Sequence, residues 1–208
     1  MKKTGDRSPL NKGREHLLAA ILPPSNISRQ IDLIREQLFS DYCLVSAAAL
    51  PPLIPLLFLP PGRYTLQEVQ LKEKIGKAFS ITAGHYRECQ GNLFLAVDSN
   101  GGYDCLKQEL KNYLLAGAVE MAGAQEAPFP CTEGFFLAAP ERLTDFSKVI
   151  KKVIKKLGIP GPLHFSSYYL AVLKLESYSN PGKWWQNISW EETNKLNCRK
   201  PSKRAPQP

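Results

Sequence analysis

The side chains that can do acid–base chemistry are few in this chain, because its 208 residues include only three histidines. His164 and Ser166 form a His-x-Ser pair, and alternation along an extended strand would place Tyr168 on the same face. An imidazole titrates near neutral pH, and a hydroxyl beside it can hold a phosphate oxygen. The pattern predicts a small acid–base or anion-binding group, although it equally suits an ordinary strand at a sheet edge.

A second candidate pair is His85 with Arg87, which alternate along another expected strand and could bind an anion together. The same two residues also fit the solvated face of a hairpin. His85 and His164 are the histidines that could work as an acid–base pair. We find no phosphate-binding loop, no dinucleotide fingerprint and no zinc-ligand spacing, so the sequence predicts neither a cofactor nor a metal ion.

The net charge of +8 lies at the two ends of the chain. Residues 1–14 carry five basic and one acidic residue, and residues 195–208 carry five basic residues and no acidic one, so the body between them is close to neutral. Basic tails can bind phosphates through counterion release, and they also keep a protein in solution. The charge alone therefore does not identify nucleic acid as a partner.

The cysteines indicate the cellular compartment, and the apolar runs indicate whether a segment could cross a membrane. Five cysteines without a C-x-x-C spacing favour reduced thiols, and hence the cytoplasm. The apolar run at 44–61 is interrupted by prolines and falls short of the roughly 20 residues that a spanning helix needs. We therefore expect no membrane segment, and a monomer.

The hydrophobic periodicity predicts an α+β protein. Strands are expected at 16–22, 56–59, 79–87, 92–97, 134–139, 163–175 and 184–190, and helices at 25–39, 65–77, 106–115 and 142–157. This order favours two lobes, split near residue 118, in which pseudo-symmetric antiparallel sheets carry helices on their outer faces and enclose a groove. We expect a flexible basic arm at 1–14, one bilobal domain at 15–192 and a flexible basic tail at 193–208.

The most apolar stretch, Ala47–Pro61, carries no charge and contains five prolines. A proline has no N–H to offer to a ladder of hydrogen bonds, so such a run fits neither a central strand throughout its length nor a helix. We interpret it as a short buried strand at 56–59, with prolines at both ends.

The same stretch resembles the first motif of the two-histidine phosphoesterases, which include 2'-5' RNA ligases and cyclic nucleotide phosphodiesterases. That motif typically reads Leu-Pro-Pro-His-x-Thr-Leu-x-Phe-Leu-Gly. Here Leu50–Pro60 keeps the frame, but Leu53 stands for the histidine and Pro55 for the threonine. The later hairpin and the Gly-Lys-Trp-Trp-x-x-Ile-x-Trp pattern at 182–190 are also similar, so the resemblance covers roughly residues 15–192.

The second motif of that family, His-x-Thr-Leu-Ala, is best placed on Gly134–Ala138, where Gly134 stands for the histidine and Phe136 for the threonine. A shift toward Cys131 and Thr132 is possible, but no shift recovers a histidine. Both His-x-Thr motifs are therefore degenerate.

The resemblance implies a mechanism in which one imidazole removes a proton, the other donates one, and two hydroxyls hold the phosphate. Leucine, proline, glycine and phenylalanine can perform neither task. We therefore expect a 2'-5' RNA ligase-like protein without catalysis, which binds RNA, a nucleotide or another phosphoester in the groove between its lobes. One alternative is an active 2',3'-cyclic phosphodiesterase that uses His85 and His164. Another is a protein-interaction module with a closed groove, in which Leu53, Pro55 and Phe136 are core residues.

Overall fold

The structure is a computed structural model, and it describes residues 14–59, 78–114, 129–139, 146–158, 163–177 and 188–199. The helix predicted at 65–77 and nearly all of the basic arm lie outside these residues. So do the first residues of the strand predicted at 184–190.

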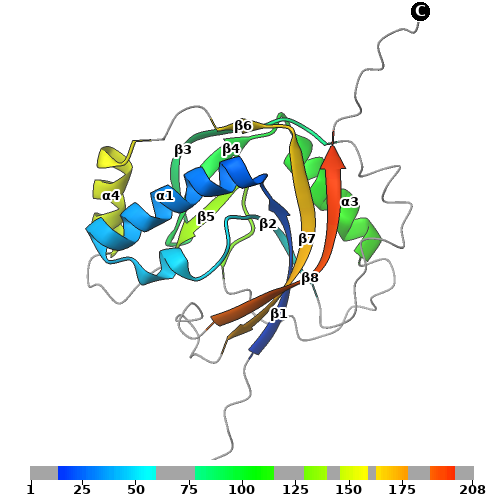
Figure 1. Cartoon of the computed structure of the whole chain (residues 1–208), viewed down its shortest axis with the longest axis horizontal. Coiled ribbons are helices and arrows are strands. Elements are labelled where there is room, and N and C mark those ends of the chain that lie inside the picture. The colour runs from blue at the N-terminus through cyan, green and yellow to red at the C-terminus, as the bar shows by residue number, and fades with distance from the viewer. Residues whose placement is uncertain are drawn as a thin grey trace, which may run out of the picture.

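The described part contains eight strands, three α-helices and one short 3₁₀ helix, η1 (Figure 1). The strands are β1 (Arg14–Leu22), β2 (Ile54–Leu59), β3 (Ile81–Cys89), β4 (Asn92–Asp98), β5 (Gly134–Ala138), β6 (His164–Phe165), β7 (Ser167–Ser177) and β8 (Ile188–Arg199). The helices are α1 (Ser25–Tyr42), η1 (Val45–Ala48), α3 (Gly102–Leu114) and α4 (Phe146–Lys156).

The strands form two four-stranded sheets, and every pairing between neighbours is antiparallel. The first sheet, sheet A, has the order β2-β1-β7-β8, and the second, sheet B, has the order β5-β4-β3-β6. The prediction of an α+β fold with two antiparallel sheets is confirmed. The predicted division near residue 118 is wrong, because sheet A combines the two ends of the chain and sheet B its middle.

Local sequence explains several of these elements. The turn between β3 and β4 consists of Gln90 and Gly91, with φ of 48° and 74°. Two consecutive residues with positive φ make the turn whose twist suits a hairpin. Helix α1 begins at Ser25 directly after Pro24, without a side-chain cap. Ser25 and Asn26, whose side chains are of the types that often cap helices, lie in its first turn.

The strand predicted at 163–175 is two strands that belong to different sheets. β6 pairs with β3 in sheet B, and β7 pairs with β1 and β8 in sheet A. Ser166 lies at the bend between them. The two serines at 166 and 167 interrupt the apolar and aromatic residues at this bend, but two small polar residues in an extended run do not by themselves indicate a change of sheet.

The last strand lies further along the chain than expected. β8 pairs with β7 from Ile188 to Arg199, with a register shift opposite Val172 and Leu173. The ordered part therefore continues past 192, where we placed the end of the domain. The flexible tail predicted at 193–208 begins too early, because residues 193–199 belong to sheet A.

The helices bury one face each. α1 buries Ile27, Ile31, Ile34 and Leu38 in the larger hydrophobic cluster, which also contains side chains from both sheets. α4 contributes Ile150 and Val153 to the same cluster, and its lysines at 151, 152, 155 and 156 are exposed. Figure 1 shows α1 across β5 of sheet B. α3 packs against β2 of sheet A. No helix among the described residues has the length and apolarity needed to cross a bilayer.

Candidate functional site

The strands β2 and β5, near which the sequence predicts the two degenerate motifs, lie next to each other. β2 and β5 are edge strands of their sheets, and the N–H of Phe136 donates a hydrogen bond to the carbonyl oxygen of Leu53, the residue before β2, at 3.1 Å. The side chains of Leu53 and Phe136 are both 0% exposed. The two residues therefore meet inside packed protein.

A row of aromatic rings fills the space around these positions. Phe136 lies between Phe94 and Phe129, with ring centroids 5.6 Å and 4.8 Å away, and Phe129 meets Phe58 at 5.2 Å. The ring of His16 continues the row, 6.0 Å from that of Phe58. Such ring pairs contribute about 0.5–1.5 kcal/mol each beyond the burial of their area. The second hydrophobic cluster, which contains Leu53 and Phe136, is therefore a core and not an open site.

A side chain at Gly134, which we align with the second histidine of the family, would be crowded. A Cβ atom on Gly134 would lie 3.0 Å from the carbonyl oxygen of Leu95 and 3.3 Å from the Cα of Ala96. Both atoms belong to the backbone of β4, which pairs with β5 and would have to shift by a few tenths of an ångström. The close approach of the neighbouring strand therefore favours glycine here.

Pro55, which we align with the threonine of the first motif, is also part of the core. The carbonyl oxygen of Pro55 accepts a hydrogen bond from the hydroxyl of Tyr103 at 2.8 Å. Burial raises the pKa of Tyr103 far above its ordinary value, so this hydroxyl stays protonated at neutral pH. None of the four motif positions offers a group that could transfer a proton.

The alternative second motif, at Cys131 and Thr132, is not a catalytic group either. Burial raises the pKa of the Cys131 thiol to about 12, which leaves it protonated and a poor nucleophile. The hydroxyl of Thr132 accepts a hydrogen bond from Arg87 at 2.6 Å, and Arg87 also donates to the carbonyl oxygen of Glu133 at 3.1 Å. Arg87 therefore fixes the entry to β5.

His85 and His164 are both exposed and lie on sheet B. His164 is opposite Thr82 in the pairing of β6 with β3, and its Nδ1 lies 2.9 Å from the hydroxyl oxygen of Thr82. His85 is three residues further along β3, which corresponds to roughly 10 Å at 3.3 Å per residue. The imidazoles therefore lie on one sheet, but this separation does not place both within hydrogen-bond reach of a single phosphate oxygen.

The expected grouping of Ser166 and Tyr168 with His164 does not form. Alternation stops at Ser166, because the chain changes sheets there. Tyr168 is buried in the larger cluster, where its ring lies 5.2 Å from that of Phe79. Burial raises its pKa well above the ordinary value, so its hydroxyl cannot serve as a base at neutral pH.

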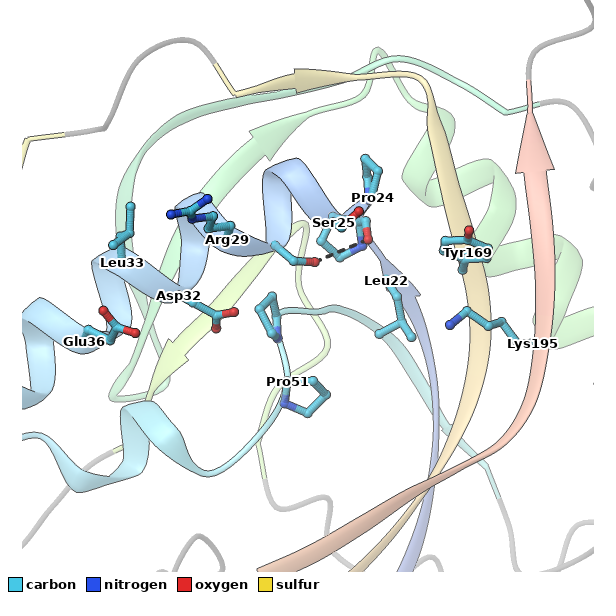
Figure 2. A pocket seen from close by; sticks show the side chains of 13 residues that line it. Leu22, Pro24, Ser25, Arg29, Asp32, Leu33, Glu36, Pro51, Tyr169 and Lys195 are labelled. Atoms are coloured by element: carbon cyan, nitrogen blue, oxygen red, sulfur yellow. Dashed lines mark hydrogen bonds between the residues drawn. The ribbon is translucent and has the colours of Figure 1, made fainter.

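Open hollows on the described surface lie away from Gly134 and Phe136, and the sequence did not predict them. Two adjoining hollows of about 870 Å³ and about 490 Å³ lie between α1, the turn at 51–52, and strands β7 and β8. We call them together the α1–β8 groove. Both are lined by Asp32, Glu36, Pro51 and Pro52. Figure 2 shows the larger hollow, with α1 on one side and Tyr169 and Lys195 on the other.

A buried arginine holds one wall of this groove in place. The guanidinium of Arg35 donates hydrogen bonds to the carbonyl oxygens of Ala47 and Leu50, and to Asp32 Oδ1 at 3.1 Å. Burial lowers its pKa, and the nearby Asp32 carboxylate opposes that shift. Ser46 connects the same segment to the end of β5, because its hydroxyl bonds the N–H and the carbonyl of Ala139 at 3.0 and 3.1 Å. The turn that carries Pro51 and Pro52 is therefore rigidly supported.

The charged side chains at the groove are only partly paired with one another. Lys195 Nζ lies 3.0 Å from Glu192 Oε2 and 4.4 Å from the centre of the Tyr169 ring. Asp32 contacts Arg35, whereas Glu36 has no hydrogen bond or ion pair within the described part of the chain. Arg29 also lines the larger hollow, so the groove offers both carboxylates and basic groups beside apolar side chains.

Comparisons with known proteins give a likeness of fold alone. No protein-family model matches the chain, and no curated protein matches it significantly. Among solved structures, the apo crystal structure of E. coli LigT is similar, with 13% sequence identity and a TM-score of 0.48. The likeness covers 91% of this chain and 99% of LigT. At this level the comparison concerns the arrangement of elements and assigns no activity to this chain.

Proposed function

We propose that this protein is a 2'-5' RNA ligase-like protein that performs no phosphoester chemistry and acts as a protein-interaction module. The observation that supports the proposal is the contact between Leu53 and Phe136, two fully buried apolar side chains that we align with the family's motifs. A general acid or base must titrate near the working pH and reach its substrate, and a buried apolar side chain can do neither.

The test is an assay of the purified full chain with 2',3'-cyclic AMP and with a 2'-5'-linked dinucleotide, followed by chromatography of the products. We expect no product above the uncatalysed background. Turnover that disappears in a Thr82→Val or His164→Ala variant would overturn the proposal, because it would mean that relocated residues do the chemistry. The variants separate this outcome from a contaminating nuclease, whose activity they would not change.

A second candidate function keeps a phosphoester ligand but moves it to sheet B. Its support is the exposed imidazoles of His85 and His164 together with the Thr82 hydroxyl on neighbouring strands. RNA or a nucleotide held there would be bound without turnover. Calorimetric titration with 2',3'-cyclic AMP is the test, and saturable binding that is lost in His164→Ala would favour this candidate over a pure protein-interaction module.

A further inference from the structure

The outer side of α1 carries one unpaired charge of each sign. Arg29 and Glu36 are both exposed, and neither makes a hydrogen bond or an ion pair within the part of the chain that the structure describes. The charged residues between them in the sequence, Asp32 and Arg35, pair with each other. One cation and one anion on the same helix are therefore available to the charges of a partner.

The spacing of Arg29 and Glu36 prevents them from pairing with each other. They are seven residues apart, which is close to two full turns, so both lie on the same side of α1. Their backbone positions are separated by about 10.5 Å along the axis, at 1.5 Å per residue. Ion pairs within a helix form between residues three or four apart. The two charges can therefore both be paired only across an interface.

An exposed leucine lies between the two charges. Leu33 is four residues after Arg29 and three before Glu36, on the same side of the helix, and it is 53% exposed. Figure 2 shows the three side chains in this order along α1. An apolar centre with a polar rim is the usual construction of a protein–protein interface.

The order of the three residues is self-complementary. The midpoint between Arg29 and Glu36 falls beside Leu33, so two antiparallel copies of α1 related by a two-fold axis at this point would have their leucines in contact. Arg29 of each copy would then lie opposite Glu36 of the other copy. A parallel pair would instead place like charges opposite each other. An interface between identical patches must contain both signs of charge to be complementary, and this patch does.

We propose that the outer side of α1 is a contact surface for a second copy of this chain, in an antiparallel pair with two-fold symmetry. One helix from each copy gives an interface no larger than the small end of the roughly 1,200–2,000 Å² range of stable complexes, so we expect weak and reversible association. The inference differs from the monomer expected from the sequence, and it goes beyond the proposed function without depending on it.

The first test is sedimentation velocity of the full chain between about 1 µM and about 1 mM, which brackets weak association. We expect monomers at the lower concentration and dimers at the higher one. Leu33→Ala should raise the dissociation constant by about tenfold, because each dimer loses two buried leucines. Ile154→Ala is the matched control, because Ile154 is 38% exposed on α4 and should leave the dissociation constant unchanged.

The second test exchanges the charges. Arg29→Glu or Glu36→Arg alone would place two like-charged pairs in the interface, so each variant should remain monomeric up to about 1 mM. An equimolar mixture of the two variants should associate, because every pair across the interface is then of opposite sign. The double variant should also associate with itself. Recovery in the mixture is specific to an antiparallel pair with two-fold symmetry, since a loss of folding in either variant could not produce it.

Three results would each overturn the inference: a parent chain that stays monomeric at about 1 mM, a dimer that persists in either single charge variant, or a mixture of these variants that does not associate. A circular-dichroism melt of each variant verifies that it is folded. The cyclic-nucleotide assay at low micromolar protein examines the monomer. Turnover there would overturn the proposed function and leave this inference standing, and a failure of association would do the reverse.

Discussion

Phe136 donates its backbone N–H to the carbonyl oxygen of Leu53, and this hydrogen bond joins β5 to the residue that precedes β2. β2 and β5 are the edge strands of their sheets, so the bond connects sheet A with sheet B. The side chains of both residues are apolar and fully buried. The contact is thus a structural joint between the two sheets.

The first prediction concerns Phe136 itself. Phe136→Ala removes a ring that packs against Phe94 and Phe129, and we expect it to lower the free energy of unfolding by about 3–5 kcal/mol. Urea denaturation followed by circular dichroism measures this. Phe39→Ala is the matched control, because the exposed Phe39 ring should contribute within about 0.5 kcal/mol. Equal effects at both positions would contradict a packed core around Phe136.

The second prediction concerns Gly134, which we align with the second histidine of the family. Gly134→Ala should be destabilising by about 1–3 kcal/mol, because its Cβ atom would press on the backbone of Leu95 and Ala96. Gly84→Ala, on β3, should be tolerated, since a Cβ atom there would lie 3.9 Å from the nearest oxygen, that of Ala96. Thermal melts of the two variants provide the comparison. A Gly134→Ala variant as stable as the parent would mean that the site has room for a family side chain.

The third prediction concerns the support of the groove wall. Arg35→Met keeps most of the aliphatic stem but leaves the carbonyls of Ala47 and Leu50 without donors, at a cost of about 1–3 kcal/mol for each. Arg29→Met, on the exposed face of the same helix, should change the free energy of unfolding by less than about 0.5 kcal/mol. Chemical denaturation of the pair tests this, and similar midpoints would show that the Arg35 bonds do not contribute to stability.

The fourth prediction is a loss of stability in alkali. Burial raises the pKa of Tyr86 to about 12 from its ordinary value of 10.0, and its hydroxyl donates to the carbonyl of Gly158 at 3.1 Å. A group with a raised pKa in the folded state binds its proton more tightly there than when unfolded. Its contribution to stability is therefore full below pH 10.0 and is lost as the pH rises to about 12. Denaturation midpoints across this window should fall, and should fall less steeply in Tyr86→Phe. The idea fails if both proteins show the same slope.

The fifth prediction concerns thiol reactivity. All five cysteines are free, and Cys43 and Cys105 are exposed. Burial raises the pKa of Cys131 to about 12 and also raises that of Cys198, so neither supplies thiolate at neutral pH. An alkylating reagent should label Cys43 and Cys105 first, and Cys131 and Cys198 only after unfolding. Peptide mapping by mass spectrometry identifies the order, and early labelling of Cys131 would contradict its burial.

Much of the fold could be predicted from the sequence, because most elements carry local signals. The helical spacing of α1 and α4, and the Gln90–Gly91 turn of the β3–β4 hairpin, are set by residues within each element. The exchange of sheets at Ser166 has no such signal. The polar run Glu191–Asn194 gave no sign that β8 continues through it. β8 lies at a sheet edge, where alternation with buried residues is not required.

The candidate site could be predicted only in part. The sequence predicted buried strands at 56–59 and 134–139, and the structure has β2 and β5 at these places, with Leu53 and Phe136 in contact. The α1–β8 groove could not be predicted, because it exists only where α1, the turn at 51–52 and β8 come together in space. The anion-binding group expected at His164, Ser166 and Tyr168 does not form, because the chain changes sheets at Ser166. This change buries Tyr168 in the core.

The interleaving of the two sheets has a consequence for synthesis. Leu18 of β1 pairs with Leu173 of β7, so a strand made early must wait for one made near the end of translation. Such distant pairings close slowly, and unpaired strand edges favour aggregation in the interval. Sheet B lacks only the two-residue β6 before residue 164, so the middle of the nascent chain can pair first. Ribosomes that stall before β7 would release a chain whose β1 exposes its apolar face, and quality control should recognise such products as misfolded.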